Sequence, residues 1–239
     1  MRYGFVKKKI VRIGVRDKFK MNISTAIRMG LLAGAISVSS LSAEEFYWDF
    51  GIAQTTGSKV LVPNELNELR ALSDAGYTVD KDGDRKVLAM SGSQPEALRT
   101  IKKMPALSNA VFKIEVKPSS SPEVSLIRNG SAWSLRYAET RGFILIVWTQ
   151  ETGDDGKIPY VQVSLPATTE TWHKVVCEIT ETSASISIDG EKASAELKAP
   201  PKTEESSLIV GSNKPSINSG TGEWKPFAGS LATLRATYK

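Results

Sequence analysis

The run Trp172-His173-Lys174-Val175-Val176-Cys177-Glu178-Ile179 constrains the fold more than any other stretch of the chain. It opens on a tryptophan and leads, through a short polar link, into the alternating run Ala184 to Lys192, which contains Asp189-Gly190. Asp-Gly readily takes the positive φ angles of a two-residue hairpin, and alternation of apolar and polar residues is typical of a half-buried strand. These two runs therefore predict an antiparallel hairpin within an all-β sandwich.

Further strand-like segments at regular spacing extend this pattern over most of the chain. They are separated by Gly, Asn, Asp and Ser, which suit turns, and they fall at 46–50, 60–62, 110–117, 124–127, 132–137, 143–148, 160–165, 208–211 and 227–238. Asp82-Gly83 predicts one more hairpin turn. The fold class predicted is an all-β antiparallel sandwich or barrel.

Two stretches have helical rather than strand spacing. Asn64 to Leu72 places leucine at every third position, and Pro95 to Lys103 starts on a proline that suits the first turn of a helix. One or two short helices are therefore expected beside the strands.

The positive charge of the chain is concentrated at its N-terminus. Residues 1–43 carry nine Lys or Arg and one Asp, whereas residues 44–239 carry 22 basic and 25 acidic residues, a net charge of −3. The sequence pI near 9.2 therefore reflects the N-terminal segment. Because a net negative domain repels phosphate backbones, nucleic acid is not an expected partner.

Residues 21–43 have the parts of a secretory signal. Arg28 precedes an apolar run at 29–38, and small residues end at Ala43, before Glu44-Glu45. The apolar run is shorter than the roughly 20 residues of a membrane-spanning helix, so we expect cleavage after Ala43 and no transmembrane span in the mature chain. An uncleaved or amphipathic N-terminal anchor is the alternative. Residues 1–20 are expected to be a non-native or unfolded extension, and residues 44–239 a single domain that is secreted, periplasmic or at the cell surface.

The single cysteine does not indicate a disulfide or a nucleophile. Cys177 has no second cysteine to pair with, and the single histidine, His173, lies four residues away on the same predicted strand. Two such positions are roughly 13 Å apart, which is too far for a hydrogen bond. We therefore expect Cys177 to be a small buried residue.

Four motifs follow one another in the C-terminal half: Trp172-His173, Ile186 to Gly190, Leu208 to Gly211, and Phe227-Ala228-Gly229-Ser230-Leu231 leading to Leu234-Arg235. In this order they resemble the laminin G-like domains of the concanavalin A-like lectin and glucanase superfamily. The resemblance covers about 143–238 and extends loosely to Phe46. It implies a jelly roll of two curved antiparallel sheets.

Superfamily members that hydrolyse β-glucans carry three acids at close alternate spacing on one strand. Here that spacing occurs only at Asp80, Asp82 and Asp84, in a turn interrupted by glycine. No catalytic residue is therefore assigned, and the chain is expected not to be an enzyme. A glycoside hydrolase with carboxylates on different strands is one alternative, and an adhesive or structural envelope module that binds protein is another.

A glycan-binding surface needs aromatic faces for sugar C–H groups and polar side chains for hydroxyls. The candidate ligand-binding residues are Trp133, Tyr137, Trp148, Trp224 and Arg136. Trp224 lies in a polar loop that imposes no core role, whereas the other aromatic candidates lie on strands and have a core role as their alternative. Trp48, Trp172 and Phe227 are expected to be core residues.

Calcium at the rim of the sandwich, which the resemblance suggests in some members, would need an acidic loop. The densest one contains Glu151, Asp154 and Asp155 between two glycines, and an exposed hairpin loop is the alternative explanation for it. No cofactor is required, and calcium is a candidate only. The sequence thus predicts an exported, non-catalytic binding module, a lectin whose partner is a polysaccharide or other glycan, with an envelope protein as the alternative partner.

Overall fold

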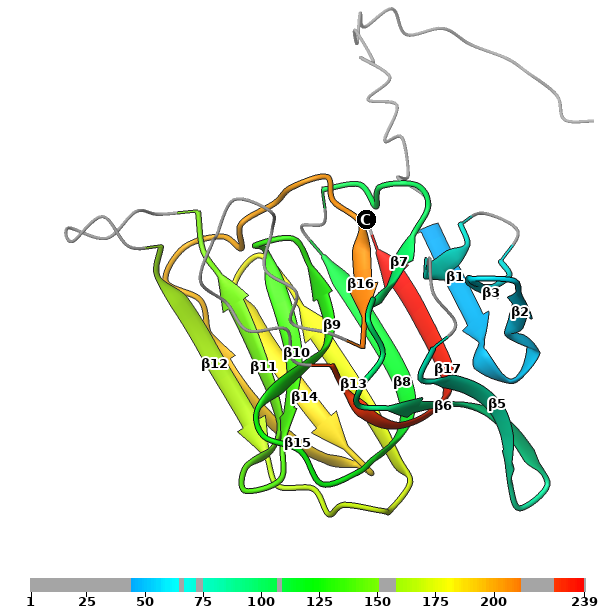
Figure 1. Cartoon of the computed structure of the whole chain (residues 1–239). Helices are drawn as coiled ribbons and strands as arrows, with labels where there is room; N and C mark the ends of the chain where they lie inside the picture. Colours follow the sequence, from blue (N-terminus) through cyan, green and yellow to red (C-terminus); the bar gives the residue numbers. More distant parts are fainter. Residues whose placement is uncertain are drawn as a thin grey trace, which may run out of the picture. The chain divides into compact units, whose positions relative to one another are not determined.

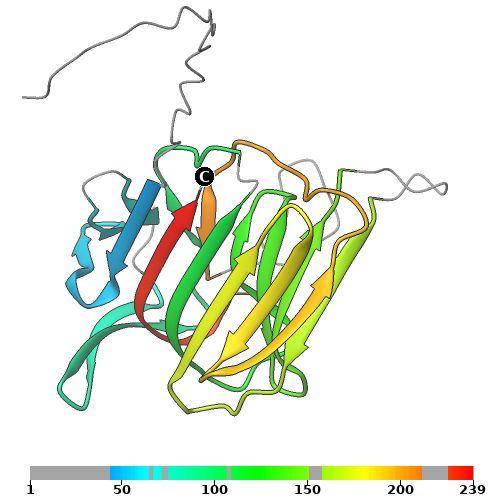
Figure 2. The same cartoon turned by 180° about the vertical axis from the view of Figure 1, so that it is seen from behind.

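Nearly all of the regular structure is antiparallel strand, arranged in two facing sheets (Figures 1 and 2). The computed structural model describes residues 44–64, 67–71, 75–106, 109–150, 158–211 and 226–238. Residues 40–239 form one compact unit. The extension predicted at 1–20 and the signal predicted at 21–43 lie outside the described residues.

Sheet A has eight strands, seen in front in Figure 2. Its order is β15 (Glu191–Glu196), β14 (Ser183–Ile188), β13 (His173–Ile179), β8 (Ala110–Pro118), β17 (Ala228–Tyr238), β6 (Arg85–Ser91) and β5 (Tyr77–Asp82), and β1 (Glu44–Asp49) also pairs with β17. The long β17 therefore has β8 along one edge and both β6 and β1 along the other.

Sheet B has nine strands, seen in front in Figure 1. Its order is β12 (Tyr160–Leu165), β11 (Gly142–Trp148), β10 (Trp133–Ala138), β9 (Val124–Asn129), β16 (Leu208–Val210), β7 (Leu98–Thr100), β4 (Leu69–Ala71), β3 (Lys59–Val62) and β2 (Gln54–Thr56). Among the described residues the one helical element is the 3-10 turn η1 (Phe50–Ile52).

The core fills the space between the two sheets because each strand alternates its side chains between two faces. In β8, Phe112, Ile114 and Val116 are buried while Lys113 is exposed. The ring of Phe112 in sheet A lies 4.2 Å from the ring of Trp133 in sheet B, centroid to centroid. This contact joins the inner faces of the two layers.

The prediction of an antiparallel sandwich is confirmed, but the two helix predictions are wrong where they can be checked. Residues 69–71 form β4 and residues 98–100 form β7. In each segment the first and third residues are buried and the arginine between them points outward, which is a period of two. Pairing of these short segments with each other and with β3 and β16 decides their conformation, and it outweighs the local spacing of leucines.

The hairpin predicted at Asp82-Gly83 is present, with its turn one residue later. Asp82 pairs with Arg85, so Gly83 and Asp84 form the turn that joins β5 to β6. Gly83 has a φ of +63°, as the first turn position of such a hairpin requires. The hairpin extends beyond the body of the sandwich in both views (Figures 1 and 2).

Candidate functional site

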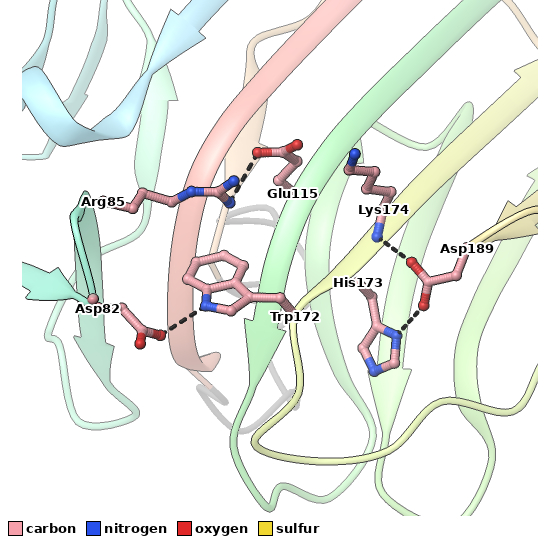
Figure 3. A pocket seen from close by; sticks show the side chains of 8 residues that line it. Asp82, Arg85, Glu115, Trp172, His173, Lys174 and Asp189 are labelled. Atoms are coloured by element: carbon pink, nitrogen blue, oxygen red, sulfur yellow. Dashed lines mark hydrogen bonds and ion pairs between the residues drawn. The ribbon is translucent and has the colours of Figure 1, made fainter.

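A pocket of about 390 Å³ opens on the solvent side of sheet A, between the β5–β6 hairpin and the turn that joins β14 to β15 (Figure 3). Asp82, Gly83 and Arg85 come from the hairpin and Glu115 from β8. Trp172 precedes β13, His173 and Lys174 begin it, and Asp189 lies in the turn between β14 and β15. Four separate segments thus meet here, two of them contributed by hairpin turns.

Trp172 is held on one side of this pocket by the β5–β6 hairpin. Its indole Nε1 donates to Asp82 Oδ2 at 2.7 Å, and the Arg85 guanidinium lies 5.1 Å from the ring centroid (Figure 3). Lys117 Nζ donates to the same Asp82 oxygen at 2.8 Å. The hydrogen bonds from Lys117 and then Trp172 lower the pKa of Asp82 below its usual value.

On the other side of the pocket, Asp189 links the turn after β14 to the start of β13. Its Oδ1 accepts from the Lys174 backbone N–H at 2.8 Å, and its Oδ2 lies 2.7 Å from His173 Nδ1. Partial burial raises the pKa of Asp189, but the bonds from Lys174 and His173 outweigh that effect and lower it overall. His173 Nε2 lies 2.9 Å from the Thr168 carbonyl oxygen, so both ring nitrogens have acceptors as neighbours.

Oppositely charged side chains on neighbouring strands lie between these two sides of the pocket. Glu115 of β8 lies directly across from Lys174 of β13, and it also forms an ion pair with Arg85 at 3.0 Å. The pocket wall therefore offers charged donors and acceptors around the partly exposed indole of Trp172, an arrangement suited to a ligand with many hydroxyl groups.

The residues predicted from the sequence do not gather at this pocket. Trp133 and Tyr137 are 3% and 0% exposed, so these two rings lie in the core and present no face to a ligand. Trp148 ends β11 and is half-buried beside Tyr160 of the edge strand β12, with ring centroids 6.3 Å apart. Arg136 is half-buried on the outer face of sheet B, paired with Glu123 at 2.7 Å.

The remaining predicted site residues lie in two predicted loops. Trp224, Glu151, Asp154 and Asp155 lie outside the described residues. Within the described part of the chain, no group of three or more His, Cys, Asp or Glu side chains could hold a metal ion.

Sequence reasoning missed Trp172 as a pocket residue. It assigned the ring to the core, as it did correctly for Trp48 and Phe227, which are fully buried. Trp172 instead precedes the first residue of β13, and Asp82 of a distant hairpin holds its ring at the surface. A signal was present in the sequence, because a strand-opening tryptophan beside charged residues suits a half-exposed position.

Comparison with protein-family models shows which family this chain belongs to. A laminin G family model, described as concanavalin A-like lectin/glucanases superfamily, matches residues 106–238. The chain belongs to this superfamily. The comparison with curated proteins gave no match.

Solved structures with little sequence identity are similar to this chain, and the similarity to a sialidase shows the fold. A Trypanosoma rangeli sialidase in complex with sialic acid has a TM-score of 0.51 at 11% identity, over 81% of this chain and 30% of that chain. Domains LG4-5 of the mouse laminin α1 chain have a TM-score of 0.49 at 16% identity, over 62% of this chain and 40% of that one. A Ruminococcus gnavus carbohydrate-binding module, CBM40, bound to α2,3-sialyllactose has a TM-score of 0.46 at 14% identity, over 63% of this chain and 88% of that one. The chain spans less than half of the sialidase and laminin chains.

Within the described part of the chain, no helix has the length and apolar character needed to span a bilayer.

Proposed function

We propose that this superfamily member is an exported, non-catalytic module that binds glycan in the pocket around Trp172. The observation that carries the proposal is the composition of that pocket. One partly exposed indole is surrounded by Arg85, Glu115, Lys174 and Asp189 within a volume of about 390 Å³. Aromatic and polar groups combined in a concave site are what sugar rings require.

The carboxylates of the pocket favour binding over hydrolysis. A glycosidase needs one carboxylic acid with a raised pKa to protonate the leaving oxygen. Here the pKa of Asp82 and the pKa of Asp189 are both lowered by donors, and Glu115 is paired with Arg85. Asp82 and Asp189 are therefore arranged to stay ionised and to accept hydrogen bonds, and Glu115 is held in an ion pair.

The proposal is tested by affinity electrophoresis through gels that contain a panel of neutral polysaccharides, with and without a calcium chelator. We expect one polysaccharide to retard the protein, and Trp172→Ala to weaken that binding about two- to tenfold, the value of one aromatic contact. Trp148→Ala is the matched control, because it removes an equally large, half-buried ring from the other sheet.

Each other outcome assigns a different role. Loss of retardation in Trp148→Ala alone would move the site to the edge of sheet B. Release of reducing ends would identify a hydrolase, and no retardation by any glycan would favour a protein-binding envelope module. Retardation that is lost in chelator would indicate the acidic loop containing Asp154 and Asp155.

A further inference from the structure

Charge is distributed unequally between the two sheets. The nine strands of sheet B contain no Asp or Glu, and the charged residues in them are all basic: Lys59, Arg70, Arg99, Arg128 and Arg136. The strands of sheet A, in contrast, contain both signs, as with Glu115 opposite Lys174. The strands of sheet B therefore carry charge of one sign, although residues 44–239 as a whole carry a net negative charge. Acidic side chains reach this sheet only from loops, as Glu123 does at Arg136 and Glu204 near Arg128, among the described contacts.

Strand register places three of these arginines in one row on the outer face of sheet B. Arg70 of β4 lies opposite Arg99 of β7, Arg99 lies opposite Ile209 of β16, and Ile209 lies opposite Arg128 of β9. The neighbours of each arginine along its strand are buried, so the three side chains point away from the core. With strands about 4.8 Å apart, the row is about 14 Å long.

This row has an electrostatic cost within the protein. Like charges directly opposite each other destabilise a sheet. Neither Arg70 nor Arg99 forms an ion pair with any residue in the described ranges. Arg128 donates to the Gly130 carbonyl oxygen at 3.0 Å, and burial and then the charge of Arg136 lower its pKa against the opposing effect of Glu204. On sheet A the comparable pair, Lys113 opposite Arg235, is relieved by Glu45, which pairs with Arg235.

We propose that the row Arg70, Arg99 and Arg128 binds an acidic polysaccharide through carboxylates carried on separate sugar rings. A guanidinium binds a carboxylate through two parallel hydrogen bonds, which suits arginine better than lysine for this ligand. Three charges over about 14 Å match a chain with widely spaced carboxylates, whereas duplex DNA carries one charge per about 1.7 Å. The inference rests on the proposed glycan-binding role but not on the Trp172 pocket, which lies on the other sheet.

The test uses polygalacturonate as the acidic probe and highly methyl-esterified pectin as the neutral form of the same backbone. It is carried out on residues 40–239, the compact unit that contains every described core residue, and in parallel on the full chain. We expect salt-sensitive binding of polygalacturonate, and at least a tenfold loss in the Arg70→Gln/Arg99→Gln variant, since hydrogen bonds between charged groups are strong.

The matched control is Lys113→Gln/Arg235→Gln, which removes the same number of cross-strand positive charges from sheet A. This variant should bind polygalacturonate as the wild type does. The single variant Arg99→Gln changes only the exposed arginine and should lose part of the binding with an unchanged unfolding midpoint. That midpoint separates loss of a ligand contact from loss of fold.

Two results with the variants would overturn the proposal: wild-type affinity of Arg70→Gln/Arg99→Gln for polygalacturonate, or an equal loss of that affinity in both double variants. Two results with other ligands would also overturn it: esterified pectin that binds as tightly as polygalacturonate, or duplex DNA that binds more tightly. Failure of the pocket proposal gives a different result. Trp172→Ala would then leave every glycan interaction unchanged, while Arg70→Gln/Arg99→Gln still loses polygalacturonate.

Discussion

At the scale of single residues, Asp189 connects turn geometry to the electrostatics of the pocket. It occupies the first turn position between β14 and β15 with a φ of +52°, a left-handed conformation that Asp and Asn tolerate better than most residues. From that position its two oxygens reach the Lys174 N–H and the His173 ring. Asparagine can keep the turn while removing the charge.

Asp189→Asn should therefore show a pH-dependent loss of stability. The pKa of Asp189 is lowered in the folded protein, so its stabilising effect is present above the ordinary value of 3.8 and is lost as the pH falls below it. We expect the variant to be about 1 kcal/mol less stable near neutral pH, a typical value for partly exposed hydrogen bonds to a charge. Urea unfolding of both proteins near neutral pH and at about pH 2 measures the difference, and a gap of unchanged size at acid pH would contradict this account.

The side chain of Cys177 should be unreactive while the protein is folded. It is buried in β13, and burial raises the pKa of the thiol to about 12, so almost no thiolate is present at neutral pH. An excess of iodoacetamide should modify Cys177 only when denaturant unfolds the chain, as followed by mass spectrometry. Rapid modification in native buffer would show that this strand opens readily.

At the scale of elements, two glycines with positive φ differ in the space around them, so that substituting one adds only backbone strain and substituting the other also adds a steric clash. A Cβ at Gly190, with φ at +101°, would meet no atom within 4 Å. A Cβ at Gly142, with φ at +75°, would lie 2.2 Å from the Leu165 carbonyl oxygen and 2.4 Å from the Ala167 nitrogen. Only the second substitution forces the β12 end of sheet B to shift.

Gly190→Ala should therefore cost about 1–2 kcal/mol, the value of a left-handed conformation for a residue with a Cβ. Gly142→Ala should cost clearly more, because the backbone of β11 and of the segment after β12 must separate as well. Chemical denaturation of the two variants checks the order of the two losses. Equal losses would mean that β12 moves away from β11 at little cost.

The strands differ in how clearly the pattern of their own residues predicts a strand. β8, β12 and β13 alternate over six to nine residues, and the sequence predicted all three within about one residue. β2, β4 and β7 have three residues each, too few to show a period, and they exist because distant strands supply their hydrogen bonds. Local patterns could not distinguish Leu69 or Leu98 in such strands from leucines of a helix.

At the scale of the whole molecule, the antiparallel sandwich was predictable from the sequence and the pocket was not. Each C-terminal motif lies within a short stretch of the sequence, so the motifs could indicate a sandwich without knowledge of distant contacts. Asp82 and Asp189, however, both line the pocket because the sheet pairs β5, β6, β17, β8, β13 and β14 in that order, and no short-range signal encodes that proximity. The same pairing turns Trp172 from an expected core residue into a pocket wall.

The family model covers residues 106–238, yet the fold is completed by strands that precede this segment. β1, β5 and β6 belong to sheet A, and β2, β3, β4 and β7 belong to sheet B. β1 and η1 bring Trp48 and Phe50, both fully buried, into the core. Loss of one such aromatic side chain costs about 3–5 kcal/mol, against about 5–15 kcal/mol for the stability of a whole domain.

Residues 106–239 alone should therefore fail to form a stable sandwich, whereas residues 40–239 should unfold cooperatively. Without β1 and β6, one edge of β17 loses its partners and exposes Leu231, Leu234 and Ala236, which are buried in the intact chain. Tryptophan fluorescence in urea and binding of a hydrophobic dye compare the two fragments. Supplying residues 40–105 in trans gives a control, since recovery of a cooperative transition would show that the missing strands are the cause. A cooperative transition of the short fragment at the midpoint of the long one would instead show that the N-terminal strands add nothing to the core.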